Sequence, residues 1–345
     1  MRFPEFTEEW REYAIGNVLS IGNGRDYKHL HNGDIPVFGT GGYMTSVDDF
    51  LYDGESVFIG RKGTINKPLY YNGKFWTVDT LFYTHSFVNV LPKFAYCLFQ
   101  TINWLKYNEA SGVPSLSKAT IEKIKVRVPS MDEQGKLSNQ LFLLDKRIEV
   151  QNKIIEKLET LIKGIRHNVF QQLRKDVGFN STIGDILSFE QPQRYIVSST
   201  EYSDDSSCTP VLTANKAFIL GYTTETDGIY SKGDCIIIDD FTLDCKYVSF
   251  PFKIKSSAIK ILTAENKYIL RFIYEYLKSL DISTEEHKRH YITEIQPSSC
   301  ILPDDKTLTT IALMFESITN KLENEQSLAL MLNKQKQYLL SKMFI

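Results

Sequence analysis

The sequence predicts an α+β fold made by internal duplication. We expect two globular α/β domains of mostly β character, separated by a long antiparallel two-helix coiled coil and related by a pseudo-two-fold axis. Three observations support this prediction: residues that recur at one constant spacing, β-branched and aromatic runs between Gly-rich turns, and two long segments with apolar residues in 4–3 spacing. A chain of 345 residues also exceeds one ordinary core. The expected parts are globular domains at 1–130 and 176–303, and helices at 131–175 and 304–345.

The duplication is visible in short segments and in single residues. Residues 15–20 recur as 183–188, and residues 35–38 have a counterpart in 209–212. Further matches keep one unbroken register along the chain, which argues against chance. These matches pair Ile121 with Ile295, Pro129 with Pro303, Glu149 with Glu323, Leu158 with Leu332 and Phe170 with Phe344.

Each globular domain is expected to contain mainly strands. Runs such as residues 56–59 and 235–238 are β-branched or aromatic and are separated by Gly-containing turns, a pattern typical of strands. Residues 94–99 and 268–277 are the candidate helices that follow the strands.

The second part of each copy predicts a long helix. Ser130 follows Pro129 and can cap the free backbone amides, while Glu133 can reach back to complete a capping box. The apolar residues beyond it form a narrow seam that requires a partner helix, with Gln151 and Glu325 as polar interruptions at equivalent places. The seam residues are Leu137, Leu141, Leu144, Ile148, Ile155, Leu158, Ile162 and Ile165 in the first copy, and Phe315, Ile318, Leu322, Leu332 and Leu339 in the second.

We interpret these helices as a spacer between the globular domains. About forty residues of helix extend roughly 60 Å, which is longer than most single domains are wide. The alternative is that each helix covers its own sheet or pairs in a homodimer. A covering helix would normally show a wider apolar face than this seam.

Composition limits the classes of function. The formal net charge is −2, so any nucleic-acid binding must depend on local patches. An acidic start and the lack of a long apolar run predict neither secretion nor membrane insertion, so the expected compartment is the cytoplasm. The five cysteines have no Cys-x-x-Cys spacing and are interpreted as buried thiols.

The sequence lacks recognisable catalytic motifs. Residues 38–42 resemble a cofactor-binding glycine loop, but the spacing is not G-x-G-x-x-G, no two prolines are adjacent, and no G-x-x-x-x-G-K-S/T loop occurs. Asp234, Asp244 and Lys246 could form a nuclease-type metal site, but parts of that pattern recur elsewhere in the chain. His29 and His31 lack a third ligand nearby. We therefore expect neither an enzyme nor a metal site.

Gly-rich loops with basic and hydroxyl side chains are the candidate binding surfaces. Such loops can present donors to base edges and backbone amides to phosphates. Each cluster alone is typical of a solvated turn, but similar clusters occur in both copies. The candidates in the first copy are Gly39, Thr40, Gly41, Gly42, Tyr43, Arg61, Lys62, Gly63, Thr64, Trp76, Ser111, Val113, Ser115 and Lys118. Those in the second copy are Thr213, Asn215, Lys216, Phe218, Asp240, Phe241, Thr242, Lys246, Ser257, Lys288, Arg289 and His290.

The first copy also contains four distinctive segments: YDGESVFIGRKG at 52–63, GVPSLSK at 112–118, VPSMDEQ at 128–134 and LLDKRI at 143–148. Together they resemble the specificity (S) subunit of type I restriction-modification systems, and the resemblance extends along the whole chain. The second copy resembles another variety of target recognition domain. It lacks the GVPSLSK and Glu-Gln motifs.

This resemblance implies a non-catalytic DNA-binding role. Two target recognition domains would each recognise one half of a split double-stranded DNA site, with the helices setting the gap. In this family the S subunit joins two modification (M) subunits, which bind S-adenosylmethionine and methylate adenine, and restriction (R) subunits, which hydrolyse ATP and cut DNA. S-adenosylmethionine, ATP and Mg would thus belong to the partners, with no cofactor bound by this chain. The alternative function is a duplicated coiled-coil scaffold or adaptor that binds proteins rather than DNA.

Overall fold

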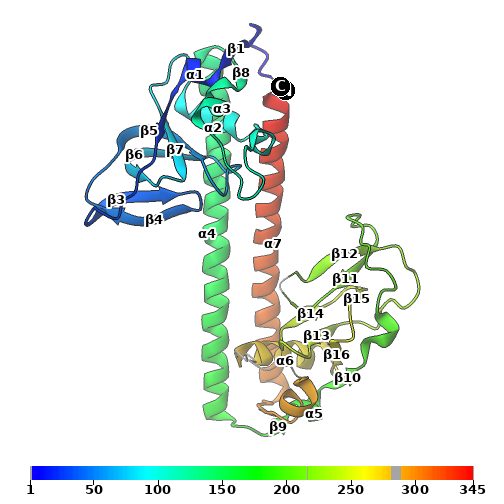
Figure 1. The fold of residues 1–345 in the computed structure, drawn as a ribbon. Coiled ribbons are helices and arrows are strands. Elements are labelled where there is room, and N and C mark those ends of the chain that lie inside the picture. Colours follow the sequence, from blue (N-terminus) through cyan, green and yellow to red (C-terminus); the bar gives the residue numbers. More distant parts are fainter. Residues whose placement is uncertain (1, 216, 281–288, 345) are drawn as a thin grey trace. The chain divides into compact units, whose positions relative to one another are not determined.

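The computed structural model describes residues 2–215, 217–280 and 289–344 (Figure 1). It divides into two compact units, one made of Met1–Asn152 with Ser327–Ile345 and the other of Lys153–Gln326. Each unit holds one globular domain and a part of each long helix. Both units combine sheets with helices, so the predicted α+β class is confirmed.

The first unit contains a six-stranded sheet with the order β2-β7-β5-β6-β3-β4. β5 pairs antiparallel with β7 and β6, whereas β3 pairs parallel with β6. Val57, Phe58 and Ile59 are buried in β5, within the run expected to be a strand. The strands are β2 (Ser20–Asn23), β3 (Asn32–Gly39), β4 (Gly42–Val47), β5 (Tyr52–Gly60), β6 (Leu69–Thr77) and β7 (Leu81–His85).

A short strand pair and several helices complete this domain. β1 pairs antiparallel with β8, which brings the beginning of the domain beside its end. Phe94 of α2, Trp104 and Ile121 of α3 are buried in the same apolar core. These elements are β1 (Arg11–Ala14), α1 (Ile15–Val18), α2 (Pro92–Phe99), a 3-10 turn at Trp104–Tyr107, α3 (Lys118–Lys123) and β8 (Lys125–Val128).

The second unit has a four-stranded sheet, β10-β16-β13-β14, and a three-stranded sheet, β12-β11-β15. The strands are β9 (Ser181–Thr182), β10 (Ser188–Glu190), β11 (Thr209–Leu212), β12 (Ile219–Thr223), β13 (Cys235–Asp239), β14 (Cys245–Val248), β15 (Lys253–Ile254), β16 (Ile259–Thr263) and β17 (Ser299–Cys300). The helices are α5 (Ile183–Ile186), a 3-10 turn at Pro192–Tyr195, α6 (Lys267–Ser279) and a π-helical turn at Tyr291–Ile295.

The two domains share one topology, as the repeat in the sequence predicts. β3 lies between an antiparallel neighbour, β4, and a parallel neighbour, β6. β11 lies in the same way between β12 and β15. The order β7-β5-β6 corresponds to β16-β13-β14, and the long strand β6 is replaced by the two short strands β14 and β15. The duplication therefore preserves strand pairing although the loops differ.

The long helices are α4 (Met131–Asp176) and α7 (Asp305–Met343), and they pack antiparallel within each unit. The core of the first unit joins Leu137 and Leu141 of α4 to Leu339 of α7, whereas that of the second joins Phe170 of α4 to Phe315 of α7. Every residue of the predicted seam is buried or half-buried.

The prediction that the helices pair with each other is confirmed inside each unit, and the alternative that each covers only its own sheet is wrong. The end of α7, from the second copy, contributes Leu339 and Met343 to the core of the first domain. The ring of Phe344 stacks on that of Phe94, with centroids 5.3 Å apart. The first domain is thus completed by the last residues of the chain.

The predicted capping box at the beginning of α4 is not the arrangement found. The carboxylate of Glu133 is buried and accepts hydrogen bonds from Arg2 Nε and Nη2, both at 2.7 Å, and from Trp10 Nε1 at 3.3 Å. Charge-assisted bonds to a guanidinium are stronger than a bond to one backbone amide, so Glu133 turns toward Arg2. Gln134 donates to Pro129 O at 2.9 Å and accepts from Leu91 N at 2.8 Å.

A second buried carboxylate, Glu275 of α6, fixes the other domain to the helices. Its Oε2 accepts from Nε and Nη2 of Arg166 on α4, at 2.9 and 2.7 Å, and its Oε1 lies 3.2 Å from Arg271 Nη2. Arg271 also donates to Phe315 O and to the hydroxyl of Thr319 on α7. The carboxylate of Glu275 therefore joins α6 to α4, and Arg271, which it holds in place, joins α6 to α7.

Four of the five cysteines are buried, as expected from the sequence, whereas Cys208 is only half-buried. Burial raises the pKa of Cys97 and of Cys235 to about 12, and that of Cys245 and of Cys300 to about 11. These four thiols are therefore protonated at neutral pH and serve as small apolar side chains. Within the described residues, none of the helices is long and apolar enough to cross a membrane.

Replacing Glu275 with Ala should destabilise the second unit, because Arg166 and Arg271 would lose their buried counter-charge. Breaking a buried pair in this way costs about 3–5 kcal/mol. Hydrogen exchange on the full chain should show faster exchange in α6 and in the strands of the second unit. Glu323→Ala, at an exposed position of α7, is the control and should change stability by less than about 0.5 kcal/mol. Equal exchange in the two variants would contradict the linking role of Glu275.

Candidate nucleic-acid interface

Two loops of the first domain, distant in sequence, form one surface after β5. The amide of Gly63 donates to Pro114 O at 2.8 Å, and the amide of Leu116 donates to Arg61 O at 2.9 Å. An antiparallel bridge joins Lys62 to Ser115. The structure therefore brings together residues 61–64 and 111–118, which the sequence analysis selected separately.

The turn between β3 and β4 lies against the same surface. Gly42 and Gly63 have φ angles of +107° and +94°, in a region that favours glycine. A β-carbon at Gly63 would lie 3.6 Å from the hydroxyl oxygen of Thr40, so the two loops are adjacent. Gly41 and Tyr43 are exposed at this turn, whereas Gly39 is buried at the end of β3. We call the three loops, residues 39–43, 61–64 and 109–118, the first recognition surface.

The first recognition surface contains an open hollow of about 570 Å³ with basic residues at its border. Arg61, Lys62 and Lys118 line it, and all three are exposed. Nη1 of Arg61 donates to Asp79 O at 3.3 Å, and its guanidinium carbon lies 5.9 Å from the centroid of the Phe82 ring. The arginine is thus partly oriented, with further N–H groups available to a ligand.

Some residues at this surface have a supporting role, and others were missed in the sequence. Trp76 is buried, and its Nε1 donates to Arg25 O at 2.8 Å, so it supports β6 from within the domain. Asn108 accepts from Ser115 N at 2.9 Å and stabilises the loop.

Glu109 and Phe82 also line the hollow. Neither Asn108 nor Glu109 belongs to a Gly-rich or basic cluster, which was the signal used.

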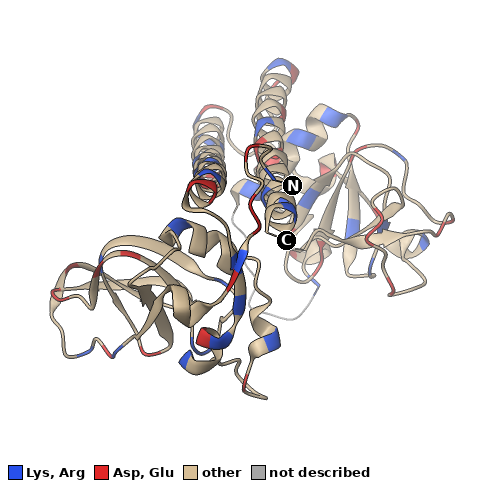
Figure 2. Ribbon diagram, turned by 90° about the horizontal axis from the view of Figure 1, so that it is seen from above, with Lys and Arg blue, Asp and Glu red and all other residues tan. Residues whose placement is uncertain are grey.

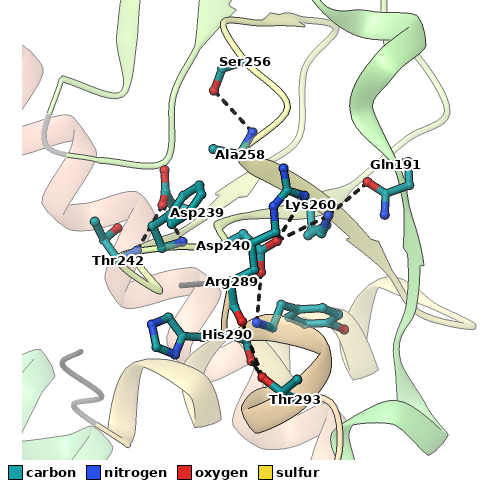
Figure 3. Close-up of polar contacts among 12 residues, drawn as sticks. Gln191, Asp239, Asp240, Thr242, Ser256, Ala258, Lys260, Arg289, His290 and Thr293 are labelled. Carbon is teal, nitrogen blue, oxygen red and sulfur yellow. Dashed lines mark hydrogen bonds and ion pairs between the residues drawn. The ribbon is translucent and has the colours of Figure 1, made fainter. Parts of the chain in front are cut away.

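Asp240 is the centre of a buried polar network in the second domain (Figure 3). Its carboxylate lies 3.4 Å from Lys260 Nζ and 3.7 Å from Arg289 Nη1, and it accepts from Tyr291 N at 3.0 Å. Lys260, also buried, donates to Gln191 Oε1 at 3.0 Å. Buried charges require such partners, and these partners fix the segment around Tyr291 to the end of β13.

The exposed residues around this network are Thr242, Ser257 and Arg289, and they define the second recognition surface. The side chain of Arg289 is 54% exposed and its guanidinium carbon lies 5.9 Å from the centroid of the Phe241 ring. His290 is buried, and its Nδ1 lies 2.9 Å from Glu294 Oε1. Asp240 and His290 therefore support the surface from the interior of the domain, whereas Arg289 is accessible to a ligand.

The other predicted residues of the second domain lie on different elements. Thr213 is buried and its amide donates to Phe218 O at 2.8 Å, while Asn215 is exposed in the turn between them. Lys246 lies within β14, opposite Ile237 of β13. Lys216 and Lys288 lie outside the described residues.

Charged residues of both signs are distributed over the sheets and helices of both units (Figure 2). This distribution agrees with the near-zero total charge and leaves local groups such as Arg61, Lys62 and Lys118 as the sources of positive potential. In the described ranges, no cluster of three or more His, Cys, Asp or Glu side chains could hold a metal ion.

The chain is a duplicated protein whose two globular domains share one strand topology. Residues 7–160 match the family model described as the type I restriction modification DNA specificity domain. The chain is 41% identical over 143 residues to the EcoR124I/EcoR124II specificity subunit of Escherichia coli, covering 39% of this chain and 35% of that protein. It is 25% identical over 167 residues to the EcoprrI specificity subunit of Escherichia coli, covering 45% and 40%. The resemblance to type I specificity subunits is confirmed.

The fold likeness extends further than the sequence likeness. The S subunit of a type I restriction-modification system from M. genitalium superposes with a TM-score of 0.76 at 16% identity, covering 99% of this chain and 97% of that one. The sequence matches, by contrast, span only about two fifths of the curated relatives or less. The likeness over the rest of the chain is thus one of fold alone.

Proposed function

We propose that this chain is the non-catalytic specificity subunit of a type I restriction-modification complex and binds a split double-stranded DNA target. Residues 1–130 and 176–303 are its target recognition domains, and residues 131–175 and 304–345 are its spacer helices. The observation that carries the proposal is the convergence of two loops, residues 61–64 and 109–118, on one hollow with basic residues at its border, in a domain that matches the DNA specificity model. Exposed Arg and Lys side chains on such loops suit phosphates and base edges.

The second half-site is assigned to the second recognition surface. Its support is the shared topology of the two domains and the exposed guanidinium of Arg289, which Asp240 holds near the end of β13. Lys246, and the turn that contains Asn215, are additional candidates on the same domain. The different loops of the two domains imply that the two half-sites differ in sequence.

The protein partners in this proposal are two M subunits, which bind S-adenosylmethionine, and R subunits, which hydrolyse ATP with Mg. The assembled complex acts on DNA in the cytoplasm. The first unit offers a suitable docking region, an open hollow of about 690 Å³ lined by Tyr70, Tyr96 and Phe142. Leu143, at its border, is 70% exposed. Lys93, Asp145, Lys146 and Glu149 also line this hollow. Exposed apolar and aromatic side chains with charged residues around them are typical of a surface that another protein covers.

The proposal is tested by mapping adenine methylation in the genome of a host that expresses this chain with its candidate M subunit. The same host without this chain is the reference. We expect a new split motif with a fixed internal gap. A soluble complex of the two proteins that adds no motif would favour the protein-binding adaptor instead.

Replacing Arg61 and Lys62 together with Ala should relax or weaken recognition of one half-site only. Both side chains are exposed and leave the strand pairing of β5 intact, so the fold should be retained. A base contact by Arg contributes about 1–3 kcal/mol of discrimination. The methylation motif should therefore degenerate in one half and stay unchanged in the other. Equal loss in both halves would contradict this assignment.

Inserting seven residues after Asn152 in α4 and seven after Gln326 in α7 should lengthen the gap and preserve both half-sites. One heptad in each helix keeps the seam in phase. The added helix is about 10 Å long, equivalent to roughly three base pairs of DNA. The methylation motif of the variant measures the new gap. An unchanged gap with both half-sites intact would rule out the spacer role.

A further inference from the structure

Glu109 occupies a fixed position at the border of the hollow in the first recognition surface. It is exposed, and its amide donates to Ser115 O at 3.0 Å. Its Oε1 atom accepts hydrogen bonds from Ser117 N at 3.3 Å, from Ser117 Oγ at 2.8 Å and from the hydroxyl of Thr120. Three donors on one oxygen hold this side chain in a single orientation, which is unusual for an exposed glutamate.

The second oxygen of this carboxylate is available. Within the described part of the chain, Oε2 of Glu109 accepts no hydrogen bond. The bonds from Thr120 and Ser117 stabilise the charged form and hold the pKa of Glu109 below its ordinary value. Glu109 is therefore ionised at neutral pH, and Oε2 is a pure acceptor at the hollow.

Arg61 supplies hydrogen-bond donors in the same hollow, where Glu109 supplies an acceptor. Its guanidinium has one hydrogen bond, to Asp79 O, and lies over the Phe82 ring. The fork of an arginine matches O6 and N7 of guanine, while a carboxylate matches the 4-amino group of cytosine. Adenine is a poorer match for a carboxylate, because its acceptor N7 lies next to its amino group. One hollow thus combines the acceptor and the donor that suit the two bases of a C·G pair.

We propose that Glu109 is a specificity-determining residue that accepts a hydrogen bond from the 4-amino group of a cytosine in the first half-site. Arg61 contacts the guanine of the same or the next base pair. This inference rests on the proposed DNA-binding function and names one base that the first domain selects. Oε1 holds the loop, and Oε2 recognises the base.

Glu109→Gln separates these two roles. The three donors around Oε1 require the amide oxygen of Gln at that position, so the amide nitrogen replaces Oε2 and an acceptor becomes a donor. The assembled complex of this chain with its M subunit is allowed to select from DNA in which the first half-site is randomised and the second is fixed. We expect the wild type to select cytosine at one position by roughly tenfold or more. The variant should lose that preference and select a base that offers an acceptor, such as thymine O4, guanine O6 or N7, or adenine N7.

Glu12→Gln is the matched control, because Glu12 is exposed on β1 and does not line the hollow. It should leave the selected bases unchanged. The wild-type complex should also bind at least roughly tenfold more weakly to DNA whose cytosine lacks the 4-amino group, a test that needs no protein variant. An unchanged base preference in Glu109→Gln, or equal weakening on all sequences, would overturn the inference while the split-site function stands. A wild-type complex with no sequence preference would overturn both.

Discussion

In each unit, one buried carboxylate that binds arginine holds the globular domain to its part of the helix pair. Glu133 binds Arg2 in the first unit, and Glu275 binds Arg166 and Arg271 in the second. A buried carboxylate without its partners is strongly destabilising, so these contacts tolerate few alternative arrangements. The apolar seam alone would allow the domains to slide along the helices, because its residues repeat every seven positions. The ion pairs remove that freedom.

Rigid attachment matters because the candidate binding residues are on loops. Loops can place a side chain accurately only if their backbones are fixed, and here the fixing bonds are between loops rather than within one. Gly63 and Leu116 exchange backbone bonds with the opposite loop in the first domain. In the second domain, the buried carboxylate of Asp240 fixes the loop backbone, because it binds Lys260 and accepts a hydrogen bond from Tyr291 N. The two copies thus stabilise equivalent surfaces by different chemistry.

The sequence predicted those parts that follow from periodicity and missed those that depend on distant contacts. A 4–3 apolar seam predicts a pair of packed helices, and every seam residue is buried or half-buried. The capping box was wrong because Arg2, remote in sequence, competes for Glu133. Glu109 was missed for a related reason: its role depends on Ser117 and Thr120, which reach it only after the loop closes. Composition cannot reveal such closure.

The near-neutral charge of the chain bears on how much phosphate contacts and base contacts would each contribute to DNA binding. A strongly basic protein would bind any DNA through phosphates, with a steep dependence on salt and little selection. Here the cations are few at each surface, and two of them lie beside carboxylates, Lys118 beside Glu122 and Arg289 beside Asp240. On the proposed function, hydrogen bonds to base edges would therefore contribute a larger share of the binding than phosphate contacts. Because the strand framework is common to both copies and the loops are not, we expect that the loops of either surface can change without altering those of the other.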